Sequence, residues 1–158
     1  MSEGLRYTKN GDKKDTYEDI LPQINCLLAS ETDIIANMAN LCAVLKEVFD
    51  FFWVGFYIVK GKDLILGPFQ GPLACTRIPY GKGVCGTAWK NRKTIIVSDV
   101  DTFEGHIACN SLSRSEIVIP LFIKNEMVAV LDIDSKDLNT FDCIDKEYLE
   151  KILAFFHL

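Results

Sequence analysis

The feature that most constrains the fold is a change in hydrophobic period about a third of the way along the chain. Apolar residues recur at helical spacing in residues 16–30 and again in residues 31–49, which predicts two amphipathic helices. We expect Thr16 to cap the first helix and Pro22 to lie near its start, since an interior proline removes a hydrogen bond. From Phe52 onwards aromatic and β-branched residues typical of strands take over.

The rest of the chain continues as strands and two more helices. We predict a short helix over residues 84–91, a closing helix over residues 142–156, and strands over residues 53–59, 64–67, 74–78, 94–97, 116–123 and 127–134. This order predicts an α+β fold, with a mostly antiparallel sheet of about six strands and helices packed on its faces. We assign residues 1–15 to a polar N-terminal extension and residues 16–158 to a single domain.

Composition excludes several classes of function. The formal net charge is −5 and the 17 basic residues form no run, which argues against nucleic-acid binding. No apolar stretch is long enough for a signal peptide or a membrane span, so we predict a cytoplasmic protein without a membrane partner. In such a reducing compartment six cysteines are core fillers, metal ligands or redox thiols rather than structural disulfides.

The neighbours of each cysteine separate these options. Cys26 and Cys42 lie beside helical apolar stripes and are interpreted as core fillers. Cys75, Cys85 and Cys109 instead lie in glycine-rich or aperiodic segments, where a thiol can be exposed and form a thiolate. Three such thiols fit a cycle of thiolate, sulfenic acid and disulfide.

Two of these thiols have neighbours that can shift their pKa. Cys85 begins the predicted short helix, whose backbone N–H groups favour an anion. Cys109 follows His106 by three residues, within the aperiodic stretch 98–115. His106 with Cys75, Cys85 and Cys109 is an alternative Cys3His zinc site, but the spacing is wrong for the usual zinc knuckles.

Two acids end the last predicted strand. Asp132 and Asp134 are two residues apart and share a face with Val128 and Val130. Buried acids beside valines need a cationic ligand or a retained proton, and either would serve a catalytic site. The alternative is that the strand simply emerges into solvent at this point.

Trp53 and Tyr57 lie four residues apart on the first predicted strand, so they share one of its faces. They could form the wall of a pocket for a methyl-sulfur group. Ordinary core packing is the alternative interpretation.

Five motifs in order give a specific resemblance over about residues 33–152. They are Leu66-Gly-Pro-Phe-Gln-Gly71, Gly81-Lys-Gly-Val-Cys-Gly86, Gly105-His-Ile-Ala-Cys109, Ser113-Arg-Ser-Glu116 and Val130-Leu-Asp-Ile-Asp134. The chain resembles the free methionine-(R)-sulfoxide reductases, which are single-domain GAF proteins. The resemblance implies a GAF-like fold and thiol-dependent reduction of the free amino acid. A ligand-sensing GAF module is the rival hypothesis from another functional class.

The resemblance also implies residue roles. Cys109 would be the nucleophile, Cys75 its disulfide partner and Cys85 a third redox thiol, with no metal and no bound cofactor. Thioredoxin would reopen the disulfide with electrons from NADPH through thioredoxin reductase, and a homodimer is left open. Asn110 departs from the acid expected there. The implied substrate-binding residues are Trp53, Tyr57, Ile107, Ala108, Glu116, Asp132 and Asp134.

The implied mechanism gives a structural prediction for the last hairpin. The thiolate would attack the sulfoxide sulfur while a carboxylic acid of the cluster donates a proton. This requires Glu116 on the same face as the two aspartates. A three-residue turn over 124–126 would pair Ile123 with Met127 and set Glu116 opposite Asp134. A two-residue turn over 125–126 would instead pair Lys124 with Met127 and send Glu116 to the other face.

Overall fold

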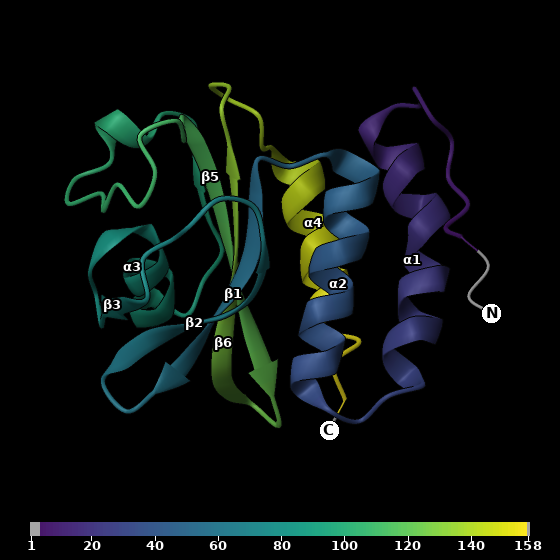
Figure 1. Ribbon diagram of the computed structural model, residues 1–158, viewed down its shortest axis with the longest axis horizontal. Helices are drawn as coiled ribbons and strands as arrows, with labels where there is room; N and C mark the ends of the chain where they lie inside the picture. The colour runs from purple at the N-terminus through teal and green to yellow at the C-terminus, as the bar shows by residue number, and fades with distance from the viewer. Residues whose placement is uncertain (1–3, 158) are drawn as a thin grey trace.

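The computed structural model describes residues 4–157 and confirms the predicted α+β class (Figure 1). Within these residues the helices are α1 (Lys13–Ala29), α2 (Ile34–Phe49), α3 (Gly83–Asn91), the short 3-10 helix η1 (Val100–Thr102) and α4 (Cys143–Leu153). The strands are β1 (Trp53–Lys60), β2 (Asp63–Gln70), β3 (Arg77–Pro79), β4 (Ile95–Val97), β5 (Ser115–Ile123) and β6 (Glu126–Ser135).

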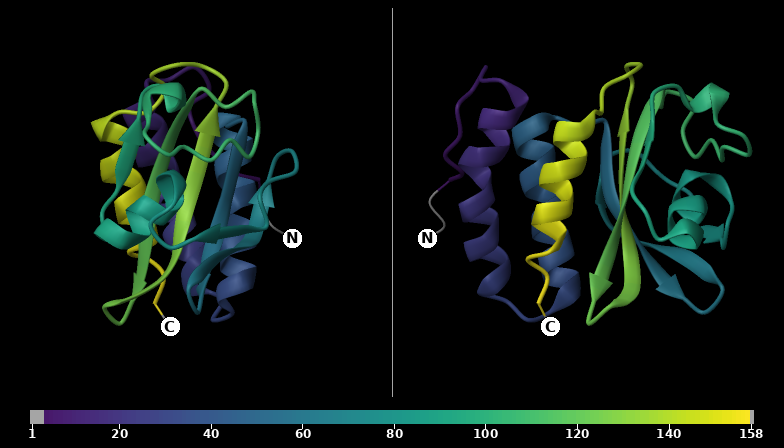
Figure 2. Two further views of the ribbon diagram at one scale, coloured as in Figure 1. Left: turned by 90° about the vertical axis from the view of Figure 1, so that its left-hand side faces the viewer. Right: turned by 180° about the vertical axis from the view of Figure 1, so that it is seen from behind.

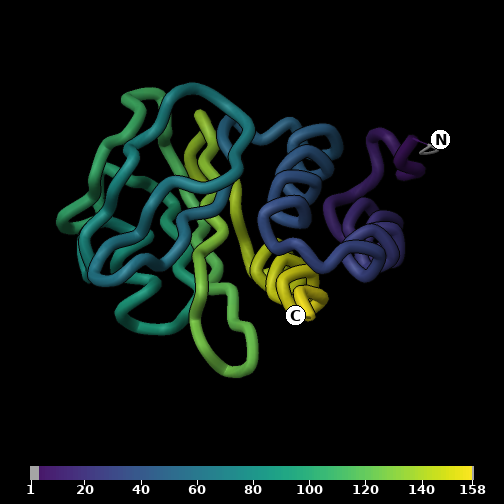
Figure 3. Tube along the Cα trace, turned by 60° about the horizontal axis from the view of Figure 1, so that its bottom comes forward, coloured from purple at the N-terminus to yellow at the C-terminus, as the bar shows by residue number. Residues whose placement is uncertain are grey.

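The strands form one sheet in the order β3-β2-β1-β6-β5-β4, and every neighbouring pair is antiparallel. Helices α2 and α4 cover one face, with α1 as an outer layer against them, while α3 and the long loops cover the other face (Figures 1 and 2). Figure 3 shows the same division from below. The sheet therefore separates a helical side from a loop-rich side.

Each side of the sheet has its own hydrophobic cluster. The larger one joins the sheet to α1, α2 and α4, and Leu5 and Tyr7 of the segment before α1 also pack against it. The smaller one lies under α3 and the loops, and includes Trp53, Tyr57 and Cys85. No helix among residues 4–157 is both long and apolar enough to cross a membrane.

Helix α1 corrects four sequence-based predictions. It is capped by Asp12 rather than Thr16, whose hydroxyl donates to the Asp12 carbonyl from inside the helix. Residues 13–15, assigned to the extension, form its first turn, and Pro22 lies in mid-helix with an exposed side chain. The buried stripe on the opposite side of the helix stabilises it, because tertiary packing outweighs the unfavourable helix propensity of Pro22. Cys26 is exposed rather than a core filler, whereas Cys42 is buried as predicted.

The β5–β6 hairpin confirms the predicted pairing of Glu116 with Asp134, but the predicted three-residue turn and the pairing of Ile123 with Met127 are wrong, because Ile123 pairs with Glu126. Its turn is the two residues Lys124 and Asn125, with φ of 51° and 64° as a type I′ turn requires. The register then shifts by one beyond Phe122, because Val128 is an extra residue in β6. Glu116 consequently pairs with Asp134, as the mechanism required.

The same bulge changes which residues share the face of the aspartates. Before it, Met127 belongs to the smaller cluster, whereas Val128 packs against the larger one on the helical side. Val128 therefore does not lie in the row of Val130 and Asp132, which corrects that expectation. Pro120 is tolerated within β5 because β4 pairs only with residues 116–118 and leaves this edge free.

Candidate active site

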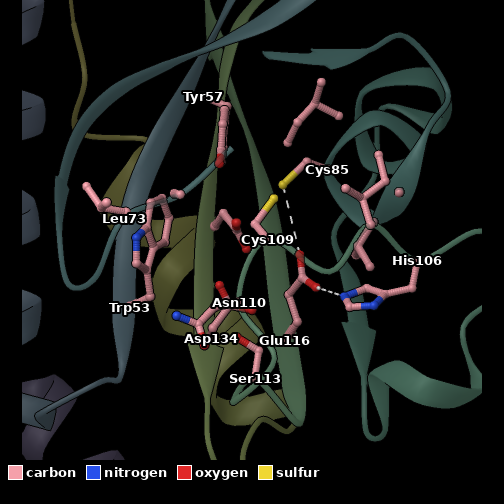
Figure 4. Close-up of a pocket in the computed structure, with 16 residues that line it drawn as sticks. Trp53, Tyr57, Leu73, Cys85, His106, Cys109, Asn110, Ser113, Glu116 and Asp134 are labelled. Atoms are coloured by element: carbon pink, nitrogen blue, oxygen red, sulfur yellow. Dashed lines mark hydrogen bonds and ion pairs between the residues drawn. The ribbon is translucent and has the colours of Figure 1, made fainter. Parts of the chain in front are cut away.

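A pocket lies on the loop-rich face of the sheet, above β1, β5 and β6 (Figure 4). Its walls come from these strands, from α3 and from the loops that follow β2 and precede β5. The lining residues are Trp53, Tyr57, Leu73, Ala74, Ile78, Gly83, Val84, Cys85, His106, Ile107, Cys109, Asn110, Ser113, Glu116, Asp132 and Asp134.

The aromatic wall of the pocket is built on β1. Trp53 and Tyr57 are buried on one face of the strand, with ring centroids 5.9 Å apart. Gly55 between them is required, since a Cβ there would lie 2.4 Å from the Trp53 ring. Trp53 Nε1 donates to the Pro72 carbonyl and the Tyr57 hydroxyl donates to the Cys75 carbonyl. These residues thus both line the pocket and anchor the loop that carries Cys75.

A disulfide joins Cys75 to Cys109, whose Cα atoms are 5.3 Å apart. It links the loop after β2 to the loop before β5, so two segments 34 residues apart in sequence meet over the pocket. Cys109 lines the pocket, whereas Cys75 is not among the residues that line it. Because both thiols are bonded to each other, the alternative Cys3His zinc site does not form in this state.

Three carboxyl groups converge on the floor of the pocket from β5 and β6. Glu116 is 5% exposed and Asp132 is 7% exposed, so the strand does not emerge into solvent here. Asp132 Oδ1 has no hydrogen-bond partner within residues 4–157. Asp134 also reaches the pocket, close to the Ser113 side chain (Figure 4).

Burial is the main reason why these acids resist ionisation. It raises the pKa of Glu116 well above its usual range, and the charges of Asp132 and Asp134 raise it further. Burial raises the pKa of Asp132 to about 6, although hydrogen bonds to Glu116 and Cys85 oppose the shift. The pKa of Asp134 is also raised well above its usual range by burial and by Asp132. The cluster can therefore hold protons near neutral pH.

Cys85 is part of this cluster and is buried, contrary to the expectation of an exposed thiol. Its Sγ lies 3.9 Å from Glu116 Oε1. Burial, followed by the charges of Asp132 and Glu116, raises its pKa well above the usual range, so the thiol form dominates. Burial together with the nearby acids outweighs the helix N-terminus that was expected to favour a thiolate. One ligand atom from each of Cys85, Glu116 and Asp132 lies within 4.8 Å of the others, which is compact enough for a metal ion.

His106 contacts an acid of the cluster. Its Nε2 lies 3.7 Å from Glu116 Oε2, on the side of the pocket opposite Trp53 (Figure 4). Burial lowers the pKa of His106, and the charge of Asp101 opposes that shift. A neutral imidazole beside a protonated carboxyl group follows from these two pKa shifts.

The structure brings most of the predicted site residues together, with one exception. Ile107 lines the pocket and would contact a Cβ added at Gly83, whose φ is +61°. Ala108 is exposed and does not line the pocket. Leu73 and Ser113 line it but were not singled out as site residues, because neither residue type carries a recognisable signal in a loop.

Comparison with known proteins places this pocket in a family. Residues 29–155 match the family described as GAF domain. A free methionine-R-sulfoxide reductase of Escherichia coli is 45% identical over 144 residues, which cover 90% of this chain and 87% of that protein. The chain belongs to the free methionine-R-sulfoxide reductase family of GAF proteins.

Two further relatives agree with this assignment. A free methionine-R-sulfoxide reductase of Saccharomyces cerevisiae is 38% identical, covering 94% of this chain and 87% of that protein. The X-ray structure of free methionine-R-sulfoxide reductase from Neisseria meningitidis in complex with its substrate superposes with a TM-score of 0.94. That chain is 52% identical, and the match covers 97% of this chain and 92% of that one. The GAF-like fold expected from the sequence is thereby confirmed.

Proposed function

We propose that this protein reduces free L-methionine (R)-sulfoxide to L-methionine. The observation that carries the proposal is the Cys75–Cys109 disulfide beside a pocket floored by three buried acids. A disulfide at a pocket wall is the oxidised end state that thiol-dependent sulfoxide reduction leaves behind. Membership of a family named for this activity supports the same conclusion.

The reaction starts from the reduced protein. The Cys109 thiolate attacks the sulfoxide sulfur, and a protonated carboxyl group of the acid cluster donates to the departing oxygen. The protonated oxygen then transfers to the Cys109 sulfur as the S–S bond formed in the attack breaks, so methionine leaves and Cys109 is oxidised to a sulfenic acid. Cys75 then condenses with this sulfenic acid, forming the disulfide and releasing water. The raised pKa values of the acids keep a proton available for the first step.

The acid cluster also gives a physical reason for preferring the free amino acid. Its carboxylates can bind the substrate ammonium, which a methionine residue within a peptide lacks. Leaving one member of a buried ion pair without its partner costs about 3–5 kcal/mol. A cost of this size excludes peptide-bound methionine sulfoxide without any additional contact. Trp53 and Tyr57 offer aromatic faces to the methyl-sulfur group on the other side of the pocket.

The protein would need an external reductant for each turnover. We propose thioredoxin, supplied with electrons by NADPH and thioredoxin reductase, as the partner, and the cytoplasm as the compartment. The proposed mechanism uses no resident metal or organic cofactor. A homodimer is compatible with this scheme, but no step of it requires one.

A coupled assay tests the proposal. Protein mixed with thioredoxin, thioredoxin reductase and NADPH should consume NADPH when the R epimer of free methionine sulfoxide is added. The S epimer and a peptide containing methionine sulfoxide are matched controls and should give only background rates. Binding of the R epimer without turnover would support the ligand-sensing alternative. Stoichiometric zinc in active protein would contradict the prediction of a metal-free enzyme.

A further inference from the structure

Cys85, Glu116 and Asp132 form a compact set of candidate metal ligands on the floor of the pocket. One ligand atom from each lies within 4.8 Å of the others, and all three residues are buried. They come from α3, β5 and β6, so only the fold brings them together. The set is not the Cys3His site considered from the sequence, because it needs neither cysteine of the disulfide.

Asp132 offers this set an oxygen that the described chain leaves unpaired. The residue is only 7% exposed and lines the pocket, yet its Oδ1 has no hydrogen-bond partner within residues 4–157. A buried polar atom without a partner is costly, so in folded proteins it is usually paired with protein, water or an ion. No lysine or arginine among residues 4–157 lines the pocket. A cation that enters the pocket would supply the missing partner.

The spacing of the ligand atoms fits a tetrahedral metal ion. Zinc binds thiolate sulfur at about 2.3 Å and carboxylate oxygen at about 2.1 Å, which places the two ligand atoms about 3.6 Å apart in tetrahedral geometry. Cys85 Sγ and Glu116 Oε1 are 3.9 Å apart. Side-chain shifts of a few tenths of an ångström would therefore complete the geometry without any movement of the backbone.

The types of ligand atom select among metal ions. Magnesium and calcium prefer sites built only from oxygen, whereas a thiolate favours softer ions such as zinc. One sulfur and two carboxylate ligands from the protein leave the fourth position of zinc open to the pocket, where water can fill it. The site is therefore suited to a zinc ion that reaches it through the same opening as the substrate.

We propose that Cys85, Glu116 and Asp132 bind one zinc ion, which inhibits the enzyme by occupying the place of the substrate ammonium. Zinc binds the thiolate form of Cys85, and the thiol proton passes to solvent. The bound ion also engages two carboxylates that the proposed function uses for ammonium binding and proton donation. Inhibition therefore rests on the proposed function, whereas zinc binding does not. Protein that holds zinc in this site should be inactive.

Calorimetric titration with zinc chloride tests the binding site. Protein with its disulfide intact and carrying Cys26→Ser and Cys143→Ser retains only Cys42 and Cys85 as free thiols. We expect it to bind one zinc ion per chain. Second-shell changes alone alter metal affinity by about 10–100-fold, so loss of a ligand in Cys85→Ser should weaken zinc binding at least about a hundredfold. Cys42→Ser is the matched control and should bind zinc unchanged, because Cys42 is buried in the cluster on the helical side.

Cobalt(II) identifies the ligands without any change at Cys85. It substitutes for zinc, and a thiolate bound to it gives strong charge-transfer absorption in the near ultraviolet. We expect this absorption in the parent protein and in Cys42→Ser, and its loss in Cys85→Ser. Metal binding without the absorption would overturn the proposal, because the ion would then lie on carboxylates alone. Displacement of zinc by an equal concentration of magnesium would overturn it as well.

Competition tests the overlap with the substrate. The double variant Cys75→Ser, Cys109→Ser cannot reduce methionine sulfoxide, so binding of the R epimer can be followed at equilibrium by the fluorescence of Trp53 in the pocket. Zinc at ten times its own Kd should raise the apparent Kd of the R epimer about elevenfold. An unchanged Kd would overturn the proposed inhibition. Failure of the R epimer to bind in the absence of zinc would instead contradict the proposed function, and the calorimetry would still decide whether zinc binds.

Discussion

At the scale of single residues, Cys75 and Cys109 have different proposed roles although they share one bond. Cys109→Ser removes the nucleophile, so reduction of even one equivalent of methionine sulfoxide should fall to background. Cys75→Ser should allow one turnover and then stall as a sulfenic acid, unless Cys85 forms the disulfide instead. Rapid-quench analysis of methionine formed per enzyme gives both results.

The control for this series is Cys26→Ser, because Cys26 is exposed on α1 and does not line the pocket. It should retain full turnover. Unchanged steady-state turnover of Cys75→Ser would remove Cys75 from the cycle. The double variant Cys75→Ser, Cys85→Ser then decides whether Cys85, close to Glu116, is the substitute resolving thiol.

His106 is predicted to position the proton of Glu116. The imidazole lies 3.7 Å from Glu116 Oε2 and is neutral, so it can accept a hydrogen bond from the protonated acid when the pocket tightens around substrate. His106→Phe removes this acceptor and should lower the pKa of Glu116. The alkaline limb of the kcat profile should then move to lower pH, with kcat at neutral pH falling about tenfold and KM little changed.

His106→Gln is the matched variant, because its side-chain carbonyl can accept the same hydrogen bond. It should restore most of the wild-type pH profile. Asp101 faces His106 from the neighbouring 3-10 helix, so Asp101→Asn tests whether the profile depends on that charge instead. A His106→Phe profile that superposes on the wild-type profile would show that the imidazole is only structural.

At the scale of elements, strand β1 must accommodate the Trp53 ring over Gly55. A Cβ at residue 55 would lie 2.4 Å from both Trp53 and Phe69. Gly55→Ala should therefore displace the indole, raise KM for methionine sulfoxide several-fold and lower the free energy of unfolding by about 1–3 kcal/mol. Substrate titration followed by tryptophan fluorescence, together with urea unfolding, measures both effects.

Gly67→Ala in β2 is the matched control for this prediction. A Cβ there would meet mainly the Ile58 side chain, at 3.0 Å, and would leave Trp53 untouched. It should cost stability without changing KM. Equal KM values for Gly55→Ala and the wild type would mean that the position of the indole does not determine substrate binding.

The elements also show what could be predicted from the sequence. Helical and strand periods located most elements to within a few residues, because each element buries one continuous apolar face. The predicted turn of the β5–β6 hairpin was wrong, because nothing in the sequence around Val128 shows that it is an extra residue in β6 rather than a regular strand position. The predicted pairing of Glu116 with Asp134 was nevertheless correct. It rested on the proposed chemistry, and the structure achieves it with a two-residue turn followed by a bulge at Val128.

The sequence predicted which residues form the candidate site but not the protonation state of Cys85 within it. The resemblance named the acids and the cysteines, yet burial of Cys85 follows only from how α3 packs onto β5 and β6. Local sequence favoured a thiolate at the helix start, whereas burial, reinforced by the surrounding acids, raises the pKa of Cys85 and keeps the thiol protonated. Exposure of Cys26 was missed because it depends on which side of α1 faces α2 and α4.

At the scale of the whole molecule, the acid cluster should make the ligand-free protein less stable as pH rises. A group whose pKa is higher in the folded than in the unfolded state contributes stability below its unfolded pKa, and that contribution is lost as pH rises through the folded value. For Asp132 this interval runs from its ordinary value near 4 to about 6. A cationic ligand should offset the loss by meeting the carboxylates.

Asp132→Asn should therefore stabilise the protein while weakening its substrate binding. A rise of about two pKa units corresponds to about 3 kcal/mol, so the variant should exceed the wild type by about 1–3 kcal/mol at pH 8 and match it more closely near pH 4. Urea unfolding at pH 4, 6 and 8 with the disulfide intact measures the difference. Methionine sulfoxide should raise the unfolding midpoint of the wild type but not of the variant.

Asp142→Asn provides a control with the opposite sign. Burial tends to raise the pKa of Asp142, but hydrogen bonds from Lys13 and from the first turn of α4 lower it overall. Its contribution is therefore present above its unfolded pKa and lost as pH falls, so this variant should be less stable than the wild type at pH 8 and similar at low pH. An Asp132→Asn effect that is the same at pH 4 and pH 8 would show that packing, not ionisation, sets the stability of the site. The pH dependence of stability would then give no evidence that Asp132 retains a proton in the folded, ligand-free protein.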